Sequence, residues 1–539
     1  MKRRSIKFIM LCLSVLFVVS MVGCGEKSKT KKGKEVLKEI TINLEQEPGT
    51  MDPQLLTDTI AIQANALIVE GLTRLGEGGK VVPGVAKTWD IDGSKWTLHL
   101  RKDSKWSNGE TVTANDFYYG IRRAIEPKTA SEYAYMTYYI KNAEAYNNGG
   151  IKDFNKVGLK VIDDYTLEMV LEKPAAYFAS VLSFPTYFPV NKKFAEEKGE
   201  GFALEATGLL YNGAYIIETW EHDSKMVFLK NENYWNKDAI KLDKINGLMI
   251  SDANTSLNMY KSGELDIVGL TGEQLPPYIE SKELATYSDG SVWYFEYNTV
   301  DKLFGNKKIR KAVALAIDRE KLVDKILKDG SKAGTGLVPF GFPGKDAGFR
   351  KDYGLELYKN NETEAKKLFE EGLKEVGHKG KVTISMLTGT SDSATKLAQY
   401  YQEQLRTKLG IDAQIEQVTF QIRLQRMTAK DFQIVLAGWG PDYNDPMTYM
   451  DLWISGGGNN HTSWGSKEYD KLIDKAYISS DNTVRMDAMA KAEQILVDEF
   501  PIAVTYYRNR NKLVKPRLKG VEFRSVGAEM DFYRADLAE

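Results

Sequence analysis

Residues 432–446 read FQIVLAGWGPDYNDP, an apolar run followed by a segment rich in glycine, proline, aspartate and aromatic residues. Residues 432–436 have the apolar, β-branched character of a buried strand. Residues 437–446 can neither continue a helix nor pack as a plain strand, because proline lacks a backbone donor and glycine costs ordering entropy. The stretch therefore predicts a core strand that opens into an irregular aromatic loop.

Segments on both sides of this stretch alternate between strand and helix patterns. Apolar residues at period two indicate strands, and apolar residues three and four apart indicate helices. The expected strands are 38–44, 95–101, 382–387 and 411–418, and the expected helices are 59–72, 117–124, 309–317, 365–373 and 395–409. Thr113 is expected to cap one helix, and Gly71 and Gly410 to end two others. The order of residues 382–418 predicts a βαβ unit, and 539 residues predict several mixed α/β lobes.

The chain begins with a segment typical of an export signal. Four basic residues among the first seven precede an apolar run at 8–22, which is short for a membrane span of about 20 residues. The run ends in Ser20-Met21-Val22-Gly23-Cys24, which is similar to the lipobox of bacterial lipoproteins, although Met or Val stands where Leu is usual. The resemblance implies a signal peptide at 1–23 and a diacylglycerol on Cys24. A plain secretion signal with an incidental cysteine is the alternative.

The charge is unevenly distributed. Residues 24–38 are rich in lysine and without periodicity, which predicts a flexible tether. The chain carries a net charge of −1, and residues 1–23 and 24–38 contribute +4 each, so residues 39–539 carry −9. An acidic folded part on a basic tether argues against a nucleic-acid partner and favours an anionic membrane surface. The two cysteines, Cys12 and Cys24, lie before the folded part, so no disulfide is expected there.

Residue types that carry catalysis occur without the spacing that catalysis needs. The four histidines, His99, His222, His378 and His461, form no pair four residues apart, and no G-x-S-x-G motif is present. We expect no catalytic residue, no cofactor and no metal site. A hydrolase would need a carboxylate pair hidden among the 74 acidic residues.

Phrases spread over the mature chain resemble the family-5 extracellular solute-binding proteins, the peptide, dipeptide and nickel receptors of ABC importers. The phrases include MDPQ at 51–54, WTLHLRKDSKWSNGETVTANDF at 96–117, EPKTASEYAY at 126–135, YKSGELDI at 260–267, IRKAVALAIDRE at 309–320 and AGWGPDYNDP at 437–446. The last phrase, with WYFEYN at 293–298 and KLVKP at 512–516, is most similar to the oligopeptide-binding members.

The resemblance implies a periplasmic-binding-protein-like α/β fold, with two main mixed α/β lobes plus an extra lobe around a hinged ligand cleft. The first lobe is expected to hold residues 39–75, 190–290 and 510–539. Residues 76–189 would form the extra lobe, and residues 291–509 the other main lobe. The chain would cross between the main lobes near 287–298 and 505–511.

A receptor that reads peptides regardless of side chain must satisfy an α-ammonium group and a row of backbone groups. A buried carboxylate takes the ammonium, exposed receptor backbone pairs with the ligand as an added strand, and roomy wet pockets accept side chains. The resemblance assigns these roles: Asp442 to the amino terminus, Gly438 and Gly440 to backbone pairing, and Trp439 to a side-chain pocket. It further implies ligand contacts at Asp58, Thr59, Tyr133, Glu296 and Tyr507.

The other end of the ligand has no assigned partner. Some relatives place basic residues before the loop to take a ligand carboxylate, but here those places hold Met427 and Leu436. Arg423 and Arg426 are nearby, and no pattern assigns the role to either.

We therefore expect a monomeric lipoprotein, anchored to the cell membrane and facing outward. It would capture oligopeptides and deliver them to the permease and ATPase subunits of an ABC importer, without covalent chemistry. The alternatives are a receptor for a dipeptide, a signalling peptide or a metal chelate and, from a different class, an extracellular hydrolase.

Overall fold

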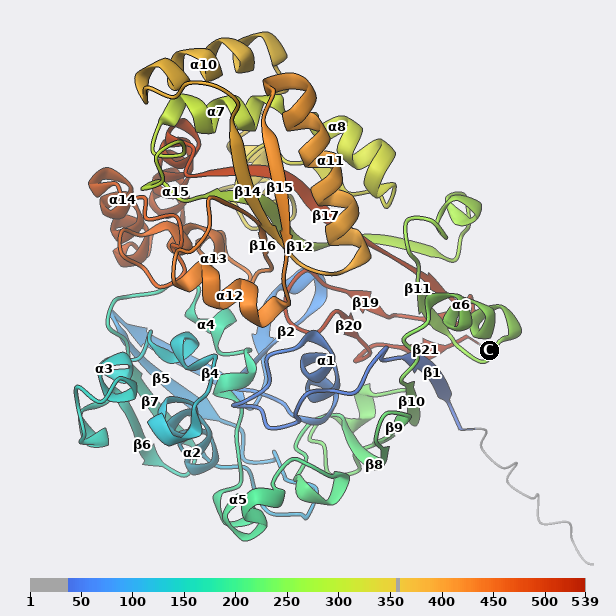
Figure 1. The fold of residues 1–539 in the computed structure, drawn as a ribbon. Helices are drawn as coiled ribbons and strands as arrows, with labels where there is room; N and C mark the ends of the chain where they lie inside the picture. The colour runs from blue at the N-terminus through green and yellow to red at the C-terminus, as the bar shows by residue number, and fades with distance from the viewer. Residues whose placement is uncertain (1–36, 355–358, 539) are drawn as a thin grey trace, which may run out of the picture. The chain divides into compact units, whose positions relative to one another are not determined.

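A mixed β-sheet of eleven strands dominates the computed structural model, which describes residues 37–354 and 359–538 (Figure 1). Ten strands follow one another across the sheet, and β13 (Lys332–Ala333) pairs with β17 outside that order. The order is β15 (Asp412–Gln417), β14 (Thr383–Thr388), β16 (Ile434–Trp439), β12 (Leu284–Tyr297), β17 (Ile502–Val514), β11 (Ile267–Gly269), β1 (Glu39–Asn43), β10 (Lys244–Leu248), β9 (Lys225–Lys230) and β8 (Tyr215–Glu221).

Two long antiparallel strands, β12 and β17, connect the two halves of this sheet. β16 pairs with residues 292–297 of β12, whereas β11 pairs with residues 512–514 of β17. The pairing between β12 and β17 shifts register at two places, after Ser288 and again between Trp293 and Tyr294. At the first, Ser288 pairs with Asn509 but Val292 pairs with Tyr507. Residues 289–291 therefore form a β-bulge opposite a single residue of β17, at the place where the chain was expected to cross.

The predicted βαβ unit is confirmed. β14 pairs in parallel with β15 and with β16, and the connections hold α11 (Asp392–Leu409) and α12 (Phe420–Thr428). Gly410 ends α11 with a φ of 68°, a left-handed conformation that glycine adopts without strain. The amphipathic segments predicted upstream form α7 (Lys307–Ala316) and α10 (Glu362–Glu375).

A separate four-stranded antiparallel sheet lies within residues 76–189. Its order is β4 (Ala86–Asp92), β5 (Lys95–Leu100), β7 (Thr166–Val170) and β6 (Leu159–Asp163). The accompanying helix α2 (Ala114–Ile125) begins at the predicted cap, where the backbone N–H of Thr113 donates to Asp116 at 2.7 Å. That reciprocal capping box satisfies backbone donors that the first helical turn cannot pair itself.

The other helices and strands are shorter and lie around these sheets. The helices are α1 (Thr59–Ile68), α3 (Ala143–Asn147), α4 (Phe178–Val181), α5 (Lys192–Lys198), α6 (Ala253–Ser262), α8 (Arg319–Lys321), α9 (Phe349–Asp352), α13 (Met447–Met450), α14 (Lys467–Ile478) and α15 (Asn482–Glu499). The strands are β2 (Thr73–Leu75), β3 (Val81–Pro83), β18 (Leu518–Lys519), β19 (Glu522–Phe523), β20 (Met530–Asp531) and β21 (Asp536–Leu537).

The hydrophobic core is divided unequally. One continuous cluster of buried side chains joins residues 72–187 to residues 292–507, and a second covers β1, α1, the strands β8 to β10 and part of the C-terminal segment. Residues 38–539 nevertheless form one compact unit. The expected lobe boundaries stay a prediction.

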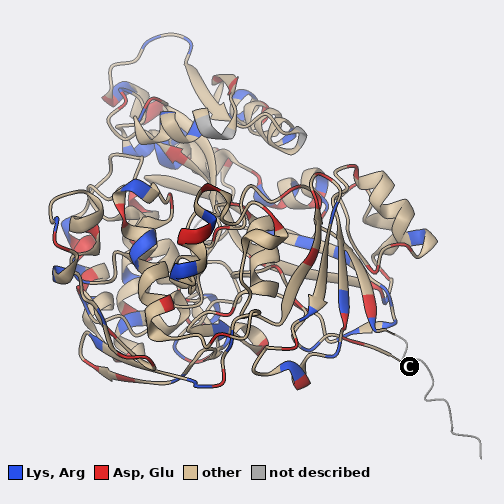
Figure 2. Cartoon of the chain, turned by 90° about the horizontal axis from the view of Figure 1, so that it is seen from below, with Lys and Arg blue, Asp and Glu red and all other residues tan. Residues whose placement is uncertain are grey.

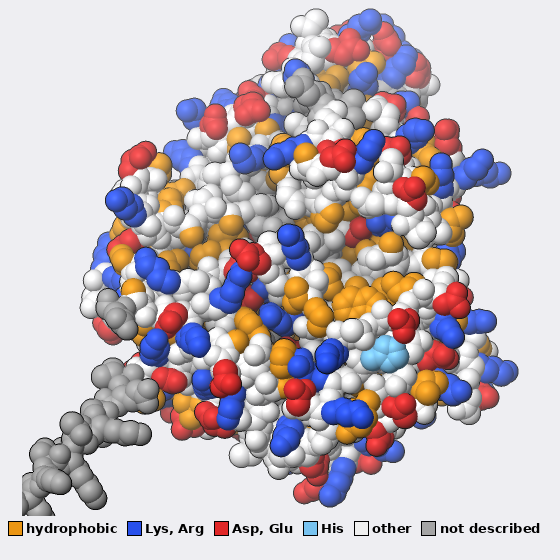
Figure 3. Space-filling view, turned by 180° about the vertical axis from the view of Figure 1, so that it is seen from behind, with side chains coloured by type: hydrophobic (Ala, Val, Ile, Leu, Met, Phe, Trp, Pro, Cys, Tyr) orange, Lys and Arg blue, Asp and Glu red, His pale blue; other side chains and the backbone are white. Residues whose placement is uncertain are grey.

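Surface composition varies along this unit. Basic and acidic side chains are interspersed along its helices and strands (Figure 2), and hydrophobic side chains gather in a band across the middle of one face (Figure 3). In the described ranges, no helix has the length and apolar character needed to cross a bilayer.

Two sequence predictions were wrong in detail. The strand expected to end at Leu436 continues through Ala437 and Gly438 to Trp439, because β12 pairs with every one of these residues. Helix α1 ends at Ile68, before the expected stop at Gly71, and the chain becomes extended at Val69. The predicted signal peptide, Cys24 and nearly all of the tether lie outside the described residues.

The bulge in β12 yields a stability prediction. Gly290 has a φ of 74°, and a Cβ there would lie 2.7 Å from Pro441 Cγ. Gly93 has a φ of 61° with nothing within 4 Å of an added Cβ. Gly93→Ala should cost about 1 kcal/mol through backbone strain alone, and Gly290→Ala about 3 kcal/mol. Differential scanning calorimetry measures both, and equal losses would show that the contact with Pro441 does not constrain the bulge.

Candidate functional site

The outer edge of β16 is only partly covered. The backbone N–H of Asn298 donates to the carbonyl of Gln433, so residues 433, 435, 437 and 439 direct their backbone groups toward β12. Ile434, Leu436 and Gly438 therefore face the opposite edge. β14 covers this edge only at Ile434 and Val435, and the carbonyl of Leu436 accepts from Arg423 Nη1 at 3.1 Å. Gly438 comes next, and none of the described residues hydrogen-bonds to its outward groups.

The position of Gly438 has no room for a side chain, because an aromatic ring occupies the space. A Cβ there would lie 2.8 Å from the ring of Trp293, which stacks at 5.9 Å on Tyr506. The absence of a side chain also leaves the backbone of Gly438 accessible to another chain. Beside it, the indole N–H of Trp439 is buried and has no hydrogen-bond partner in the described part of the chain.

Asp442 lies just beyond this edge and carries an uncompensated carboxylate. Its backbone N–H donates to Thr448 Oγ1 at 3.1 Å, and its Oδ2 accepts from the hydroxyl of Tyr135 at 3.3 Å. Burial, and after it the charge of Asp451, raise the pKa of Asp442 to about 7 against the opposing effect of the hydrogen bond from Tyr135. No described cation forms an ion pair with Asp442. A group of this kind gains most from a positively charged ligand.

Two tyrosines from residues 76–189 lie against Asp442. Tyr133 precedes a short 3₁₀ turn at Ala134–Thr137, and this turn directs Tyr135 toward the carboxylate. The rings of Tyr133 and Tyr135 are 5.6 Å apart. Burial and the charge of Asp442 together raise the pKa of both phenols, which therefore stay protonated and able to donate. The structure thus brings predicted residues Tyr133 and Asp442 together.

Aromatic stacking and hydrogen bonds hold the Asp442 loop against the same part of the chain. The ring of Tyr443 stacks on Tyr177 at 5.1 Å, and its hydroxyl donates to Asp451 at 3.0 Å. The backbone N–H of Asn444 donates to Ser180 Oγ at 3.0 Å. Burial raises the pKa of Asp451 to about 7. The charge of Asp445 adds to the shift at Asp451, and the charge of Asp451 adds to the shift at Asp442.

The neighbouring acid is neutralised inside the protein. Asp445 and Arg485 form a buried ion pair at 2.9 Å, with both side chains at most 6% exposed. Arg485 also lies 5.1 Å above the ring of Tyr177. Of the acidic residues in the loop, Asp442 is therefore the one available to a ligand.

The bulge in β12 packs against the loop that carries Asp442. Gly290 packs against Pro441, and its carbonyl accepts from the hydroxyl of Tyr449 at 2.6 Å. Asp289 accepts from both Arg508 Nε at 2.6 Å and Arg510 Nε at 3.1 Å. Gly440, another predicted contact, lies beside Ser291, with an added Cβ 3.6 Å from its hydroxyl. The place where the two halves of the sheet join is thus also the base of the candidate site.

Glu296 is more deeply buried than its predicted role requires. It is 2% exposed and lies 3.3 Å from His461 Nδ1. Its charge also acts on Arg423, because burial lowers the pKa of Arg423 and Glu296 opposes that shift. Glu296 of β12 therefore belongs to a small buried group of polar side chains with His461 and Arg423.

The remaining predicted residues have structural tasks. Tyr507 is 2% exposed, and its hydroxyl accepts from the backbone N–H of Gly336 and donates to its carbonyl at 2.8 and 2.7 Å. Asp58 caps α1 by accepting from the N–H of Ala61 at 2.7 Å, and its carbonyl accepts from Ile62 at 3.1 Å. These bonds leave Tyr507 and Asp58 little capacity for a ligand. No hydrogen bond or ring contact joins Thr59 to the Asp442 group among the described residues.

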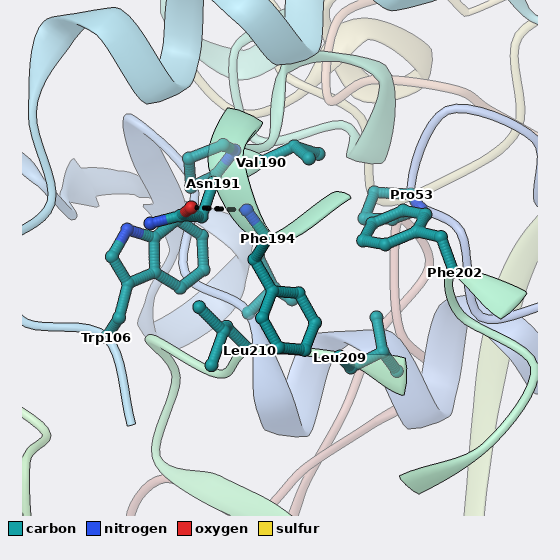
Figure 4. Close-up of a pocket in the computed structure, with 10 residues that line it drawn as sticks. Pro53, Trp106, Val190, Asn191, Phe194, Phe202, Leu209 and Leu210 are labelled. Carbon is teal, nitrogen blue, oxygen red and sulfur yellow. Dashed lines mark hydrogen bonds between the residues drawn. The ribbon is translucent and has the colours of Figure 1, made fainter. Parts of the chain in front are cut away.

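An apolar crevice lies elsewhere and has different chemistry. Its lining includes Pro53, Trp106, Phe194, Phe202 and Leu209 (Figure 4). No predicted site residue lines it, and the space inside it is about 10 Å³, which is about the room that one water molecule needs. In the parts that the structure describes, no group of three or more His, Cys, Asp or Glu residues could hold a metal ion.

Sequence patterns missed two residues of this neighbourhood. Tyr135 reaches Asp442 only because the 3₁₀ turn folds the chain back. Asp451 lies nine positions after Asp442 and meets Tyr443 through a helical turn. Arg423, which the sequence named without a role, reaches Leu436 from α12. Tertiary packing creates these contacts, so no periodicity in the sequence signals them.

Comparison with known proteins places the chain in a family. The family model described as bacterial extracellular solute-binding proteins, family 5 Middle, matches residues 80–461. The chain belongs to this family, and its mixed α/β architecture is that of the periplasmic-binding-protein-like fold.

Particular relatives span nearly the full chain. The dipeptide-binding protein DppE of Bacillus subtilis (strain 168) is 35% identical over 94% of this chain and 92% of its own length. The oligopeptide-binding protein OppA of the same organism is 33% identical over 98% of each chain. The solved structure of Listeria monocytogenes OppA bound to peptide is 33% identical, covers 94% of this chain and 100% of its own, and superposes with a TM-score of 0.79.

Replacement of Asp442 and of Asp445 by asparagine should have opposite effects on thermal stability. Because the pKa of Asp442 is raised from 3.8 to about 7 by folding, its ionised form costs stability above pH 4, and the cost is complete above pH 7. Asp442→Asn should therefore raise the Tm of ligand-free protein at pH 8 and leave it nearly unchanged at pH 4. Asp445→Asn should lower the Tm, because it leaves Arg485 buried and unpaired at a cost of about 3–5 kcal/mol. Thermal melts at both pH values test this. If Asp442→Asn does not raise the Tm at pH 8, the assignment is wrong.

Proposed function

We propose that this protein captures oligopeptides outside the cytoplasm and delivers them to an ABC importer. One observation carries the proposal: Asp442, a partly buried carboxylate that forms no ion pair with any described residue, follows the open strand edge at Gly438. An oligopeptide has the complementary features, a terminal ammonium followed by a regular row of backbone donors and acceptors. The names of the relatives, which include oligopeptide- and dipeptide-binding proteins, support the same ligand class.

The amino terminus of the ligand would supply the positive charge that no described residue places beside Asp442. An ammonium at Asp442 forms a charge-assisted hydrogen bond and removes the cost of an isolated buried anion. Tyr133 and Tyr135 surround the same carboxylate with protonated hydroxyls and apolar ring faces. This arrangement holds the amino terminus by its charge and leaves the identity of the first side chain open.

The ligand backbone would add to β16 at Gly438, as a strand adds to a sheet edge. Trp439 would border a side-chain pocket, and Gly440 would let the ligand approach the turn. Glu296 would meet only a long basic ligand side chain, because it is almost completely buried. Thr59 would contact the ligand from α1, and Tyr507 and Asp58 would act indirectly by holding their own loops.

Ligand capture would involve closure of two main lobes, with the extra lobe moving with one of them. The boundaries proposed from the sequence are 39–75 with 190–290 and 510–539, then 76–189, then 291–509. A core cluster that lies, except for Phe188, within the first of these groups supports its separation from the other two, which share one cluster. The bulge at residues 289–291 is the proposed hinge. No catalytic step is proposed, and the energy for transport would come from the partner ATPase.

The anchor is proposed from the sequence alone. Cys24 would carry the lipid, and residues 24–38 would tether a monomeric receptor to the outer face of the cell membrane. The alternatives remain a dipeptide, a single signalling peptide, a metal chelate, or hydrolysis of an extracellular substrate. Native mass spectrometry of purified protein separates them, because a general oligopeptide receptor should carry peptides of mixed mass and release them unchanged.

Chemical blocking of the peptide tests the role of Asp442. N-acetylation of a bound peptide removes the ammonium, so its affinity for the wild type should fall about 10- to 100-fold in isothermal titration calorimetry. Asp442→Asn should bind the free peptide equally weakly and should not distinguish it from the acetylated form. Asp445→Asn, provided it remains folded, is a control that should still distinguish them. An acetylated peptide that binds the wild type at full affinity would exclude Asp442 as the ammonium site.

The affinity should depend on pH with two limbs. Below about pH 7, Asp442 in the free protein must lose a proton before it can bind, so affinity should fall as pH decreases. Above about pH 8 the peptide amine, whose pKa is about 7.7–8.0, loses its charge, and affinity should fall again. Asp442→Asn should abolish the acidic limb, and calorimetry of the wild type at pH 6 in buffers of different ionisation enthalpy should show proton release on binding. An unchanged acidic limb in Asp442→Asn would assign it to another group such as Asp451.

A further inference from the structure

Tyr133 and Tyr135 lie in an irregular segment of the chain, residues 131–137. Just before it, Ala130 has a φ of 52°, in the left-handed region that residues with a Cβ seldom adopt. The 3₁₀ turn at Ala134–Thr137 is four residues long, and such short turns have poorer hydrogen-bond geometry than an α-helix. The positions of the two tyrosine rings therefore depend on contacts from outside the segment.

A hydrogen bond from another part of the chain holds each end of this segment. At its start, Ser131 Oγ donates to the backbone carbonyl of Gln54 at 2.5 Å. Near its end, the hydroxyl of the fully buried Tyr187 donates to the carbonyl of Met136 at 2.9 Å. The bond from Tyr187 stays within residues 76–189, whereas the bond from Ser131 joins the segment to the MDPQ stretch at 51–54.

Gln54 has a fixed position because a buried ion pair holds it. It is 1% exposed, and its side-chain amide donates to the carbonyl of Phe188 at 3.2 Å. Its Oε1 accepts from Arg123 Nη1, in α2, at 2.7 Å. Arg123 in turn forms a bidentate pair with Asp52, with bonds of 2.9 and 2.7 Å. A bidentate pair is geometrically specific, so the carbonyl that Ser131 uses is held rigidly.

A connected set of hydrogen bonds thus runs from Arg123 to the candidate site. We propose that Arg123, Gln54 and Ser131 are positioning residues that hold the hydroxyl of Tyr135 against Asp442. They would act on ligand binding through this bond and would not touch the peptide themselves. The inference rests on the proposed function, because it takes Asp442 as the group that receives the ligand ammonium.

The bond from Tyr135 affects the charge of Asp442. It favours the ionised form, whereas burial and then the charge of Asp451 raise the pKa of Asp442. Tyr133 and Tyr449 also face this carboxylate, but burial raises the pKa of both phenols, so they stay uncharged. Displacement of Tyr135 should therefore raise the pKa of Asp442 further and leave it protonated over a wider pH range.

The pKa of Asp442 can be followed without a ligand. The protein is stripped of co-purified peptide by unfolding and refolding, and it must regain the circular dichroism and Tm of the untreated protein. In the wild type, Ser131→Ala and Tyr135→Phe, the increase in Tm on adding Asp442→Asn is measured from pH 4 to pH 9. For the wild type this increase should level off above about pH 7, because ionisation of the buried carboxylate costs stability. In both variants it should level off about 0.5–1 pH unit higher.

Two further proteins complete the series. Ser131→Ala combined with Tyr135→Phe should match Tyr135→Phe alone, because both changes act through one hydrogen bond. Ser262→Ala is the control, because it removes a hydroxyl that donates to the carbonyl of Met259 at 2.9 Å in α6. It should keep the wild-type curve. In calorimetry with tetra-alanine, Ser131→Ala should lose about 3- to 10-fold in affinity at pH 6 and less at pH 8.

Each outcome decides the inference. If Tyr135→Phe moves the curve and Ser131→Ala does not, the positioning role is wrong. It is also wrong if neither variant moves the curve, or if their shifts add in the double variant. A merely structural role of Ser131 would lower the Tm equally at every pH. If N-acetylation of tetra-alanine leaves its affinity for the wild type unchanged, the ammonium site fails, and the ligand-free curves still show whether Ser131 positions Tyr135.

Discussion

The antiparallel pairing of β12 with β17 is the constraint on which the rest of this structure depends. These two strands are hydrogen-bonded on both sides of a three-residue bulge and carry one sheet from β8 to β15. Gly290, in the bulge, packs directly against Pro441, and Asp289 binds two arginines of β17. A change in the angle between the halves of the sheet must therefore act on the loop that carries Asp442.

The chemistry of the candidate site follows from the different partners of three acidic side chains, Asp442, Asp445 and Asp451. Asp445 has a buried arginine, Asp451 has two tyrosine hydroxyls, and Asp442 has one hydroxyl and no ion pair within the described residues. Desolvation without a counter-ion leaves Asp442 with a raised pKa and a high affinity for positive charge. The ionised form of Asp442 therefore lowers the stability of the unliganded protein, a cost that is common at binding sites.

Local patterns predicted much of the fold and part of the site. The alternation of 382–387 and 411–418, the cap at Thr113 and the stop at Gly410 are properties of short segments, and all are found. The end of the strand at Leu436 was predicted wrongly, because pairing with β12 outweighs the low strand preference of Gly438. Asp442 and Tyr133 do come together, but Tyr135 and Asp451 join them only through tertiary packing that no local pattern encodes.

The partial cover of β16 also bears on contacts between copies of the protein. An open strand edge can pair with the same edge of another molecule, and proteins commonly shorten or obstruct such edges. Here β14 covers one part of the edge, and a charged side chain from α12 blocks the next carbonyl. What stays open is about one residue, Gly438, which is too short to nucleate a sheet between two folded domains. The same partial cover of β16 therefore disfavours edge-to-edge pairing between copies of the protein.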